Sequence, residues 1–227
     1  MMKLGHWRQF VKAFLNFFLK SNCPLCSRSA VEDFCPACLR QLKGCQFSHC
    51  GQFWQGENPI FVWGEYRGSL KNAIRALKYN DNAHLARPLG YWLADAWLSD
   101  PPLSVNSVIV VPIPLHRDKL KQRGFNQADL LAESFCELTG FTLKRQGLER
   151  IKNTDPLFNL SPRDRSQQMQ DSFILGQDFR GKRPSQGVLL LDDIYTTGAT
   201  VSAAIKTLNQ ARIKVYGTVA IATTRKK

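Results

Sequence analysis

The most informative segment of the chain is residues 188–200, V-L-L-L-D-D-I-Y-T-T-G-A-T, where an apolar run precedes two adjacent carboxylates and a loop rich in threonine and glycine. The apolar run predicts a buried strand that ends at the acid pair, and a helix is expected to begin after the loop. Successive backbone N–H groups at the start of such a helix form a cup for a phosphate, and threonine hydroxyls add donors. Gly198 lets the backbone close on the anion.

The two acids need a different explanation, because Asp192 and Asp193 would repel a phosphate. Carboxylates suit the hydroxyls of a ribose, or a magnesium ion reached through water. A phosphate cup beside an acid pair therefore describes a site for a ribose 5-phosphate. The residues predicted to form the cup are Thr196, Thr197, Gly198, Ala199 and Thr200.

The cysteines form a second candidate site, because six of the seven lie close together near the N-terminus. C-P-L-C at 23–26 and C-P-A-C at 35–38 provide four thiols in two paired positions, which fit tetrahedral zinc. Reduced or redox-active thiols are the alternative. Cys45 and Cys50 are free, replace one of the four, or join His49 in a weaker site. The predicted zinc ligands are Cys23, Cys26, Cys35 and Cys38.

The composition excludes a chain that is disordered throughout, since 44% of its 227 residues are hydrophobic. It also argues against a membrane-spanning protein, because the apolar run at 107–115 is interrupted by Pro112 and Pro114, well short of the ~20 apolar residues that a span needs. The 31 basic and 18 acidic residues give a net charge of +13. A surface this basic predicts a polyanionic partner, either nucleic acid or a phosphorylated molecule.

The N-terminal residues 3–20 have apolar side chains at helical spacing, with basic residues between them. We expect an amphipathic helix that packs on its own protein; a membrane surface or a partner is the alternative. The segment has no small-residue cleavage site and does not resemble a signal peptide. Without export the thiols stay reduced, so we expect a cytoplasmic protein, with association at the inner face of the membrane as an additional hypothesis.

The rest of the chain predicts an α/β fold, because buried strands alternate with helices in the order typical of a parallel sheet with helices on both faces. We expect three parts: an amphipathic helix over 1–20, a zinc-ribbon-like module over 21–60, and the α/β domain over 61–227. A long loop is expected over 150–172. The predicted strands are 107–111, 187–191 and 215–222, and the predicted helices are 69–77, 83–98, 126–138 and 199–210.

Residues 188–200 resemble the PRPP-binding motif of type I phosphoribosyltransferases at all thirteen positions. The resemblance implies that Asp192 and Asp193 are the catalytic-site acids that bind the ribose hydroxyls, and that the loop from Thr196 to Thr200 holds the 5-phosphate. It also implies that Mg²⁺ accompanies the pyrophosphate of PRPP.

Two further segments narrow the resemblance. Residues 108–132, which contain R-G-F-N-Q-A at 123–128, and I-R-A-L-K-Y at 74–79 are similar, together with the cysteine cluster, to the ComF-type competence proteins. That family combines an N-terminal zinc finger with a phosphoribosyltransferase-like domain and is implicated in handling incoming single-stranded DNA. In the transferases the loop after the first core strand contacts pyrophosphate, which implies an anion site; a solvated basic loop is the alternative. The basic residues concerned are Arg117, Lys119, Lys121 and Arg123.

The chain departs from the family pattern in the loop before the PRPP strand. A T-x-x-Q is replaced by T-D-P-L-F-N-L-S-P-R at 154–163, and Arg163, Arg165 and Phe173 remain of the pattern that follows it. In the transferases this loop closes over the substrate, so its divergence counts against turnover more than against binding. His84 and His116 are the available histidines, although a lone histidine is more often structural.

Three functions fit these features. The first is a competence factor that handles single-stranded DNA in the cytoplasm and has a pocket for PRPP or another ribose 5-phosphate. The second is an active phosphoribosyltransferase acting on a base-like acceptor. The third is a non-catalytic scaffold for proteins of the DNA-uptake machinery. The net charge, the zinc module and the resemblance over nearly the whole chain favour the first.

Overall fold

The computed structural model describes residues 21–30, 32–103, 107–152, 172–181 and 183–225. The helix predicted over 1–20 lies outside the described residues, as do most of the long loop predicted over 150–172 and its Arg163 and Arg165.

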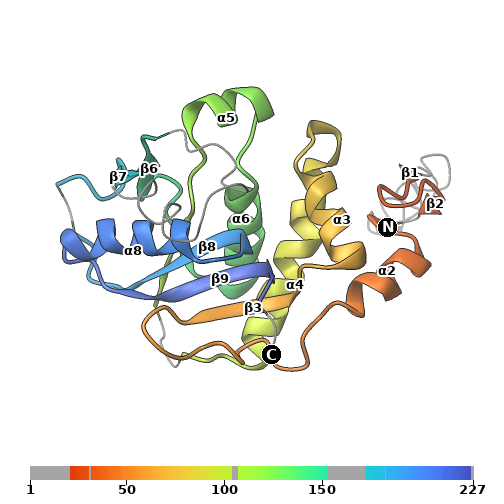
Figure 1. Cartoon of the computed structure of the whole chain (residues 1–227), viewed down its shortest axis with the longest axis horizontal. Coiled ribbons are helices and arrows are strands. Elements are labelled where there is room, and N and C mark those ends of the chain that lie inside the picture. Colours follow the sequence, from red (N-terminus) through yellow and green to blue (C-terminus); the bar gives the residue numbers. More distant parts are fainter. Residues whose placement is uncertain (1–20, 31, 104–106, 153–171, 182, 226–227) are drawn as a thin grey trace, which may run out of the picture.

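The centre of the protein is a five-stranded parallel sheet in the order β3-β9-β8-β4-β5 (Figure 1). The three predicted strands are confirmed and form its middle. They are continuous apolar runs because both faces of the sheet are covered. The strands are β3 (Ile60–Glu65), β4 (Ile109–Pro112), β5 (Thr142–Leu143), β8 (Val188–Tyr195) and β9 (Val215–Thr223).

Helices cover both faces, as predicted, and strand β8 shows how. Its side chains alternate, so Leu189 and Leu191 pack on one face while Val188 and Leu190 pack on the other. The first face is covered by helices α3, α4 and α6, and the second by helix α8 and the antiparallel pair β6–β7. The bounds are α3 Gly68–Leu77, α4 Ala86–Ser99, α6 Gln127–Thr139, α8 Ala199–Gln210, β6 Leu148–Arg150 and β7 Phe173–Leu175, with a 3₁₀ helix, η1, at Asn80–Leu85.

The cysteine-rich segment lies at one end of the molecule, beside α3 (Figure 1). It contains the antiparallel pair β1 (Ser21–Asn22) and β2 (Ser29–Ala30), followed by helix α2 (Pro36–Lys43). An aromatic contact joins it to the sheet domain: the ring centroids of Phe34 and Trp92 are 5.8 Å apart, and Trp92 stacks on Trp63 of β3 at 5.4 Å. The ammonium of Lys43 lies 4.4 Å from the Trp92 ring centroid. The module therefore shares a packed contact with α4 and β3.

Within the part of the chain that the structure describes, none of the helices has both the length and the apolar character needed to cross a bilayer.

Candidate ribose phosphate site and cysteine cluster

Strand β8 does not end at the acid pair, which corrects the expectation from the sequence. It continues to Tyr195, because parallel pairing with β9 extends past the acids, with Asp192 opposite Ala220 and Tyr195 opposite Thr223. Asp192 and Asp193 are therefore successive residues within a strand, and their carboxyl groups lie close enough to interact with each other. The backbone N–H of Asp193 donates to Oδ1 of Asp192 at 2.8 Å.

A lysine from a distant part of the sequence reaches the acid pair. Lys78, the residue after helix α3, places its Nζ 3.3 Å from Oδ2 of Asp193. The Asp193 side chain is 17% exposed and the Lys78 side chain 33%, so the pair is partly shielded from water. The segment I-R-A-L-K-Y at 74–79 thus meets the PRPP-like motif in space. The sequence marks both segments but does not predict that they meet.

The charges of the two acids also affect two arginines. Burial lowers the pKa of Arg123, which follows β4, and the negative charge of Asp193 opposes that shift. Burial likewise lowers the pKa of Arg150, at the end of β6, and Asp192 opposes it. The guanidinium of Arg150 also lies 5.7 Å from the ring centroid of Phe173. Arg123 was a predicted site residue, whereas Arg150 was missed because nothing in its local sequence marks it.

The Asp192 carboxyl is desolvated. Burial raises its pKa well above the usual range, and the adjacent charge of Asp193 raises it further, while Lys78 opposes both effects. A proton on Asp192 is therefore held more tightly in the folded protein than in the unfolded chain, where the pKa is about 3.9. Stability contributed by this group is greatest at low pH and is lost as the pH rises from about 4 through the raised folded value.

The Asp192→Asn variant should show this linkage. We expect its free energy of unfolding to improve relative to the wild type as the pH rises from 5 to 8, because the variant has no buried charge to form. Urea unfolding of both proteins at several pH values measures the difference. A difference that stays constant with pH would show that Asp192 ionises normally in the fold.

The threonine and glycine loop joins β8 to helix α8, as predicted. Gly198 has φ +81 and directly precedes the helix, a conformation that favours glycine. A Cβ at Gly198 would also collide with the hydroxyl of Tyr195, which accepts a hydrogen bond from Arg225 at 3.1 Å. The Thr197 hydroxyl accepts from the backbone N–H of Ala199 at 3.5 Å. Thr196 and Thr197 are exposed, and Ala199 and Thr200 are half-buried. The start of α8 is therefore accessible to an anion.

The basic segment after β4 is a short helix, α5 (Arg117–Arg123), where a loop was expected. His116 begins it, since its Nδ1 accepts from the backbone N–H of Asp118 at 3.3 Å, which gives this histidine a structural role. Glu149 of β6 accepts from Arg117 at 2.5 Å and from Arg180 at 2.9 Å. Of the four basic residues predicted near an anion, Arg117 is thus paired with a carboxylate and Arg123 lies near Asp193.

Part of the R-G-F-N-Q-A segment is explained by the fold itself. The Asn126 side chain accepts from the backbone N–H of Ala128 at 3.2 Å and donates to the carbonyl of Ile113 at 3.0 Å. It therefore caps helix α6 and ties that helix to the end of β4.

The four predicted metal ligands come together. The sulfur atoms of the four cysteines all lie within 4.8 Å of one another, and the Cys26 and Cys35 sulfurs are 3.5 Å apart. A tetrahedral zinc with Zn–S bonds of ~2.3 Å places its sulfurs ~3.8 Å apart. The first knuckle is a turn in which the backbone N–H of Ser27 donates to the Cys23 carbonyl at 2.8 Å. The cluster can hold a metal such as zinc.

The thiol chemistry also fits a metal site, which requires thiolates. A hydrogen bond from the backbone of Cys38 lowers the pKa of Cys35 to about 7. Burial acts to raise the pKa of Cys23, yet backbone hydrogen bonds from Cys35 and Leu25 leave it lowered. Burial raises the pKa of Cys38, the ligand on helix α2. Bound zinc would supply the positive charge that stabilises all four thiolates.

The remaining cysteines are separate from the cluster. Cys45 lies 3.4 Å from the Gln41 carbonyl, and Cys50 lies 3.5 Å from the Trp63 carbonyl; both are buried. Burial raises the pKa of Cys50 to about 11, so this thiol stays protonated. His49 is exposed and pairs with Asp100 at 2.8 Å. Among the described residues, the four clustered cysteines are the set that could hold a metal.

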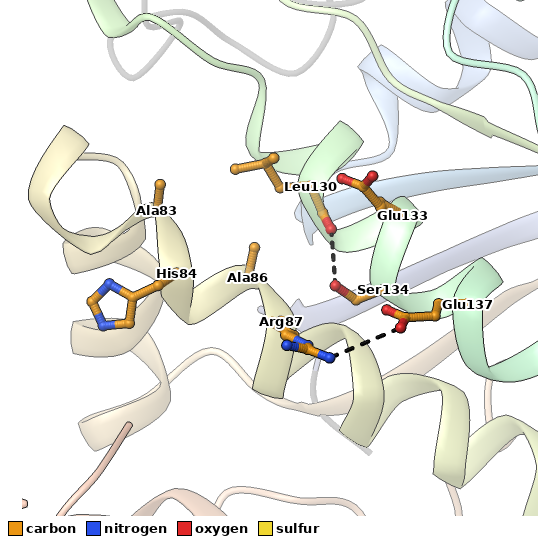
Figure 2. A pocket seen from close by; sticks show the side chains of 8 residues that line it. All are labelled: Ala83, His84, Ala86, Arg87, Leu130, Glu133, Ser134 and Glu137. Carbon is orange, nitrogen blue, oxygen red and sulfur yellow. Dashed lines mark hydrogen bonds and ion pairs between the residues drawn. The ribbon is translucent and has the colours of Figure 1, made fainter. Parts of the chain in front are cut away.

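A separate groove of about 560 Å³ lies between η1, α4 and α6 (Figure 2). Its polar side chains are committed to one another or to neighbouring residues. Arg87 pairs with Glu137 at 3.9 Å, Glu133 pairs with Arg145 at 2.7 Å, and the Ser134 hydroxyl donates to the Leu130 carbonyl. His84 also lines it. None of the predicted site residues lines this groove, so it does not replace the acid pair and loop as the candidate site.

The parallel sheet with helices on both faces, the acid pair and the threonine and glycine loop define an α/β protein of the type I phosphoribosyltransferase-like class, joined to a small cysteine module.

No family model matches the chain. It is 27% identical to "Competence protein F" of Haemophilus influenzae, over 89% of this chain and 98% of that protein. It is 26% identical to "DNA utilization protein YhgH" of Escherichia coli K12, over 88% and 84% of the two chains. "Competence protein ComFC" of Bacillus subtilis is 29% identical, over 63% and 55%. These similarities confirm the predicted resemblance to the ComF-type competence proteins.

Proposed function

We propose that the protein acts in the uptake and use of DNA during competence, binding single-stranded DNA in the cytoplasm and PRPP or another ribose 5-phosphate at the end of strand β8. The names of its relatives, competence protein F and DNA utilization protein, support the general role. The observation that carries the pocket is the 3.3 Å ion pair between Lys78 and Asp193, which joins two distant segments beside the phosphate loop.

Each part of a ribose 5-phosphate has a matching group in this arrangement. The N–H groups at the start of α8 and the hydroxyls of Thr196 and Thr200 would bind the 5-phosphate. Asp192 and Asp193 would accept hydrogen bonds from the ribose hydroxyls. Lys78 neutralises part of the acid pair, and Arg123 adds positive charge for a pyrophosphate. Mg²⁺ would accompany PRPP and shield its phosphates. Transfer of the ribosyl group is not part of the proposal.

DNA binding is proposed to be electrostatic, because the chain has a net charge of +13. Affinity for a single-stranded oligonucleotide should therefore fall steeply with salt and depend little on sequence. A plot of log K against log salt is expected to have a slope of about −0.7 for each phosphate contacted. Fluorescence anisotropy with two unrelated oligonucleotides of equal length, between 50 mM and 300 mM salt as a rough range, measures it. A flat salt response would contradict the proposal.

A further inference from the structure

Tyr79 differs from the other tyrosines of the chain. All five tyrosines are described, and four have a lysine or arginine over the ring: Lys71 on Tyr66, Arg87 on Tyr91, Arg225 on Tyr195 and Lys214 on Tyr216. Within the described residues, the Tyr79 ring makes no such contact and stacks on no other aromatic ring. It is 69% exposed, the largest value among the exposed large hydrophobic residues. An aromatic face is thus open to solvent at this position.

Tyr79 directly follows the lysine that contacts the acid pair. It is the residue next to Lys78, whose ammonium contacts Asp193, and the two Cα atoms are ~3.8 Å apart. Its backbone N–H donates to the Ala76 carbonyl at 3.0 Å, and its own carbonyl accepts from Asn82 at 3.0 Å, so both backbone groups are fixed. Figure 1 shows that helix α5 and the segment between α3 and α4 rise on the same side of the sheet.

The charges near the acid pair suit a ligand that carries phosphate groups. Lys78, the residue before Tyr79, brings a positive charge to Asp193. The negative charge of Asp193 also acts to raise the pKa of Arg123 against the effect of burial.

We propose that Tyr79 is the stacking platform for a nucleobase whose ribose and phosphate occupy the acid pair and the threonine and glycine loop. The inference rests on the proposed function and adds a base to the ligand. Base–aromatic stacking is largely independent of the identity of the base, because every base has a π-face. The same chemistry is available from a free nucleotide or from one nucleotide of a DNA strand, and the experiment separates these two sources.

The test compares two ligands that differ only in the base. Ribose 5-phosphate and adenosine 5′-monophosphate are titrated calorimetrically into the full chain, as wild type and as Tyr79→Ala, Tyr79→Phe and Tyr91→Ala. Tyr91→Ala is the matched control, because it removes a tyrosine ring from helix α4. We expect the wild type to bind the nucleotide about tenfold more tightly than ribose 5-phosphate, the size of a base-stacking contribution. Tyr79→Ala should lose this preference, while Tyr79→Phe and Tyr91→Ala keep it.

A second arm identifies the source of the base. A thymidylate decamer without a 5′-phosphate is titrated into the same variants. A loss of affinity in Tyr79→Ala for the decamer alone would assign the ring to DNA, and a loss for the nucleotide alone would assign it to a free nucleotide; either result supports stacking. If the wild type binds ribose 5-phosphate but Tyr79→Ala changes neither the nucleotide nor the decamer, the inference is overturned.

The proposed function can fail separately. If neither ribose 5-phosphate nor PRPP binds the wild type, the ribose phosphate pocket is wrong, and with it the placement of the base in that pocket. The decamer arm then decides what remains: a weaker decamer affinity in Tyr79→Ala would retain the ring as a base platform, and an unchanged affinity would remove it.

Discussion

Replacing both acids, as Asp192→Asn with Asp193→Asn, is expected to weaken the binding of PRPP with Mg²⁺ by about a hundredfold or more. A hydrogen bond to a charged group contributes about 1.5–3 kcal/mol, and two such acceptors face the ribose hydroxyls in the proposed complex. Asparagine keeps the size of each side chain and removes the charge, so it also removes the partner of Lys78. The effects of the single variants should not add, because the two acids are adjacent and coupled. Isothermal titration calorimetry of the single and double variants measures all three.

A charge-matched control separates the local effect from a change in net charge. Glu133→Gln with Glu137→Gln removes two negative charges from the groove on helix α6, away from the acid pair. This control should bind PRPP as the wild type does. If the double asparagine variant binds PRPP with wild-type affinity, the two acids do not contact the ligand. If the control loses affinity as well, the loss in the asparagine variant is not specific to the acid pair.

The interior of the fold could be predicted because its strands carry their own signal. Strands β4, β8 and β9 are continuous apolar runs that are buried on both faces. Each could be predicted from its own residues, without knowledge of the strand with which it pairs. The edge strand β3 was not predicted from the sequence. Strand β3 lies directly after the cysteine-rich segment, and its partner strand in the sheet is β9, from the far end of the chain. Its sequence became a strand through that pairing, which no local pattern reports.

The candidate site likewise has one part that the sequence predicted and another part that it did not. The phosphate loop was predictable because strand, acids, loop and helix start are contiguous in residues 188–200. Lys78 and Arg150 were not assigned to the site, because each approaches the acids by tertiary folding from another element. The acids were also placed at a strand end, whereas pairing with β9 carries the strand two residues further. The sequence pattern therefore predicted a ribose phosphate site, and tertiary packing added the basic side chains that lie near its acids.

In the cysteine module, the spacing of the cysteines along the sequence was sufficient to predict which of them lie together. Two knuckles of identical spacing predicted that these four cysteines come together, since each knuckle is formed locally, the first by a turn and the second by the start of helix α2. For Cys45 and Cys50 the sequence left three alternatives. Their carbonyl contacts in the folded chain show that they are buried core thiols, separate from the cluster.

Cys38→Ser is expected to reduce bound zinc from about one ion per chain to nearly none, because a structural site needs all four ligands. The module has only short strands and one helix, and metal binding contributes on the order of 10–16 kcal/mol in isolated zinc fingers. Its helix α2 carries Cys38 and is anchored to the metal site through it. Metal analysis after dialysis measures the loss. Cys50→Ser is the matched control, since it makes the same substitution at a buried cysteine outside the cluster and should keep the zinc.

Loss of the metal should also be visible from the sheet domain. In the module, the Phe34 ring centroid lies 5.8 Å from the Trp92 ring centroid, and the Lys43 ammonium lies 4.4 Å from the same Trp92 centroid. Unfolding of the module would expose Trp92 to water, so tryptophan emission should shift to the red in Cys38→Ser and in the wild type treated with a chelator. The parallel sheet should keep its circular dichroism, because its strands pair with one another and pack against α4, α6 and α8. An unchanged emission spectrum after complete removal of zinc would mean that packing against α4 and β3 holds the module folded without its metal.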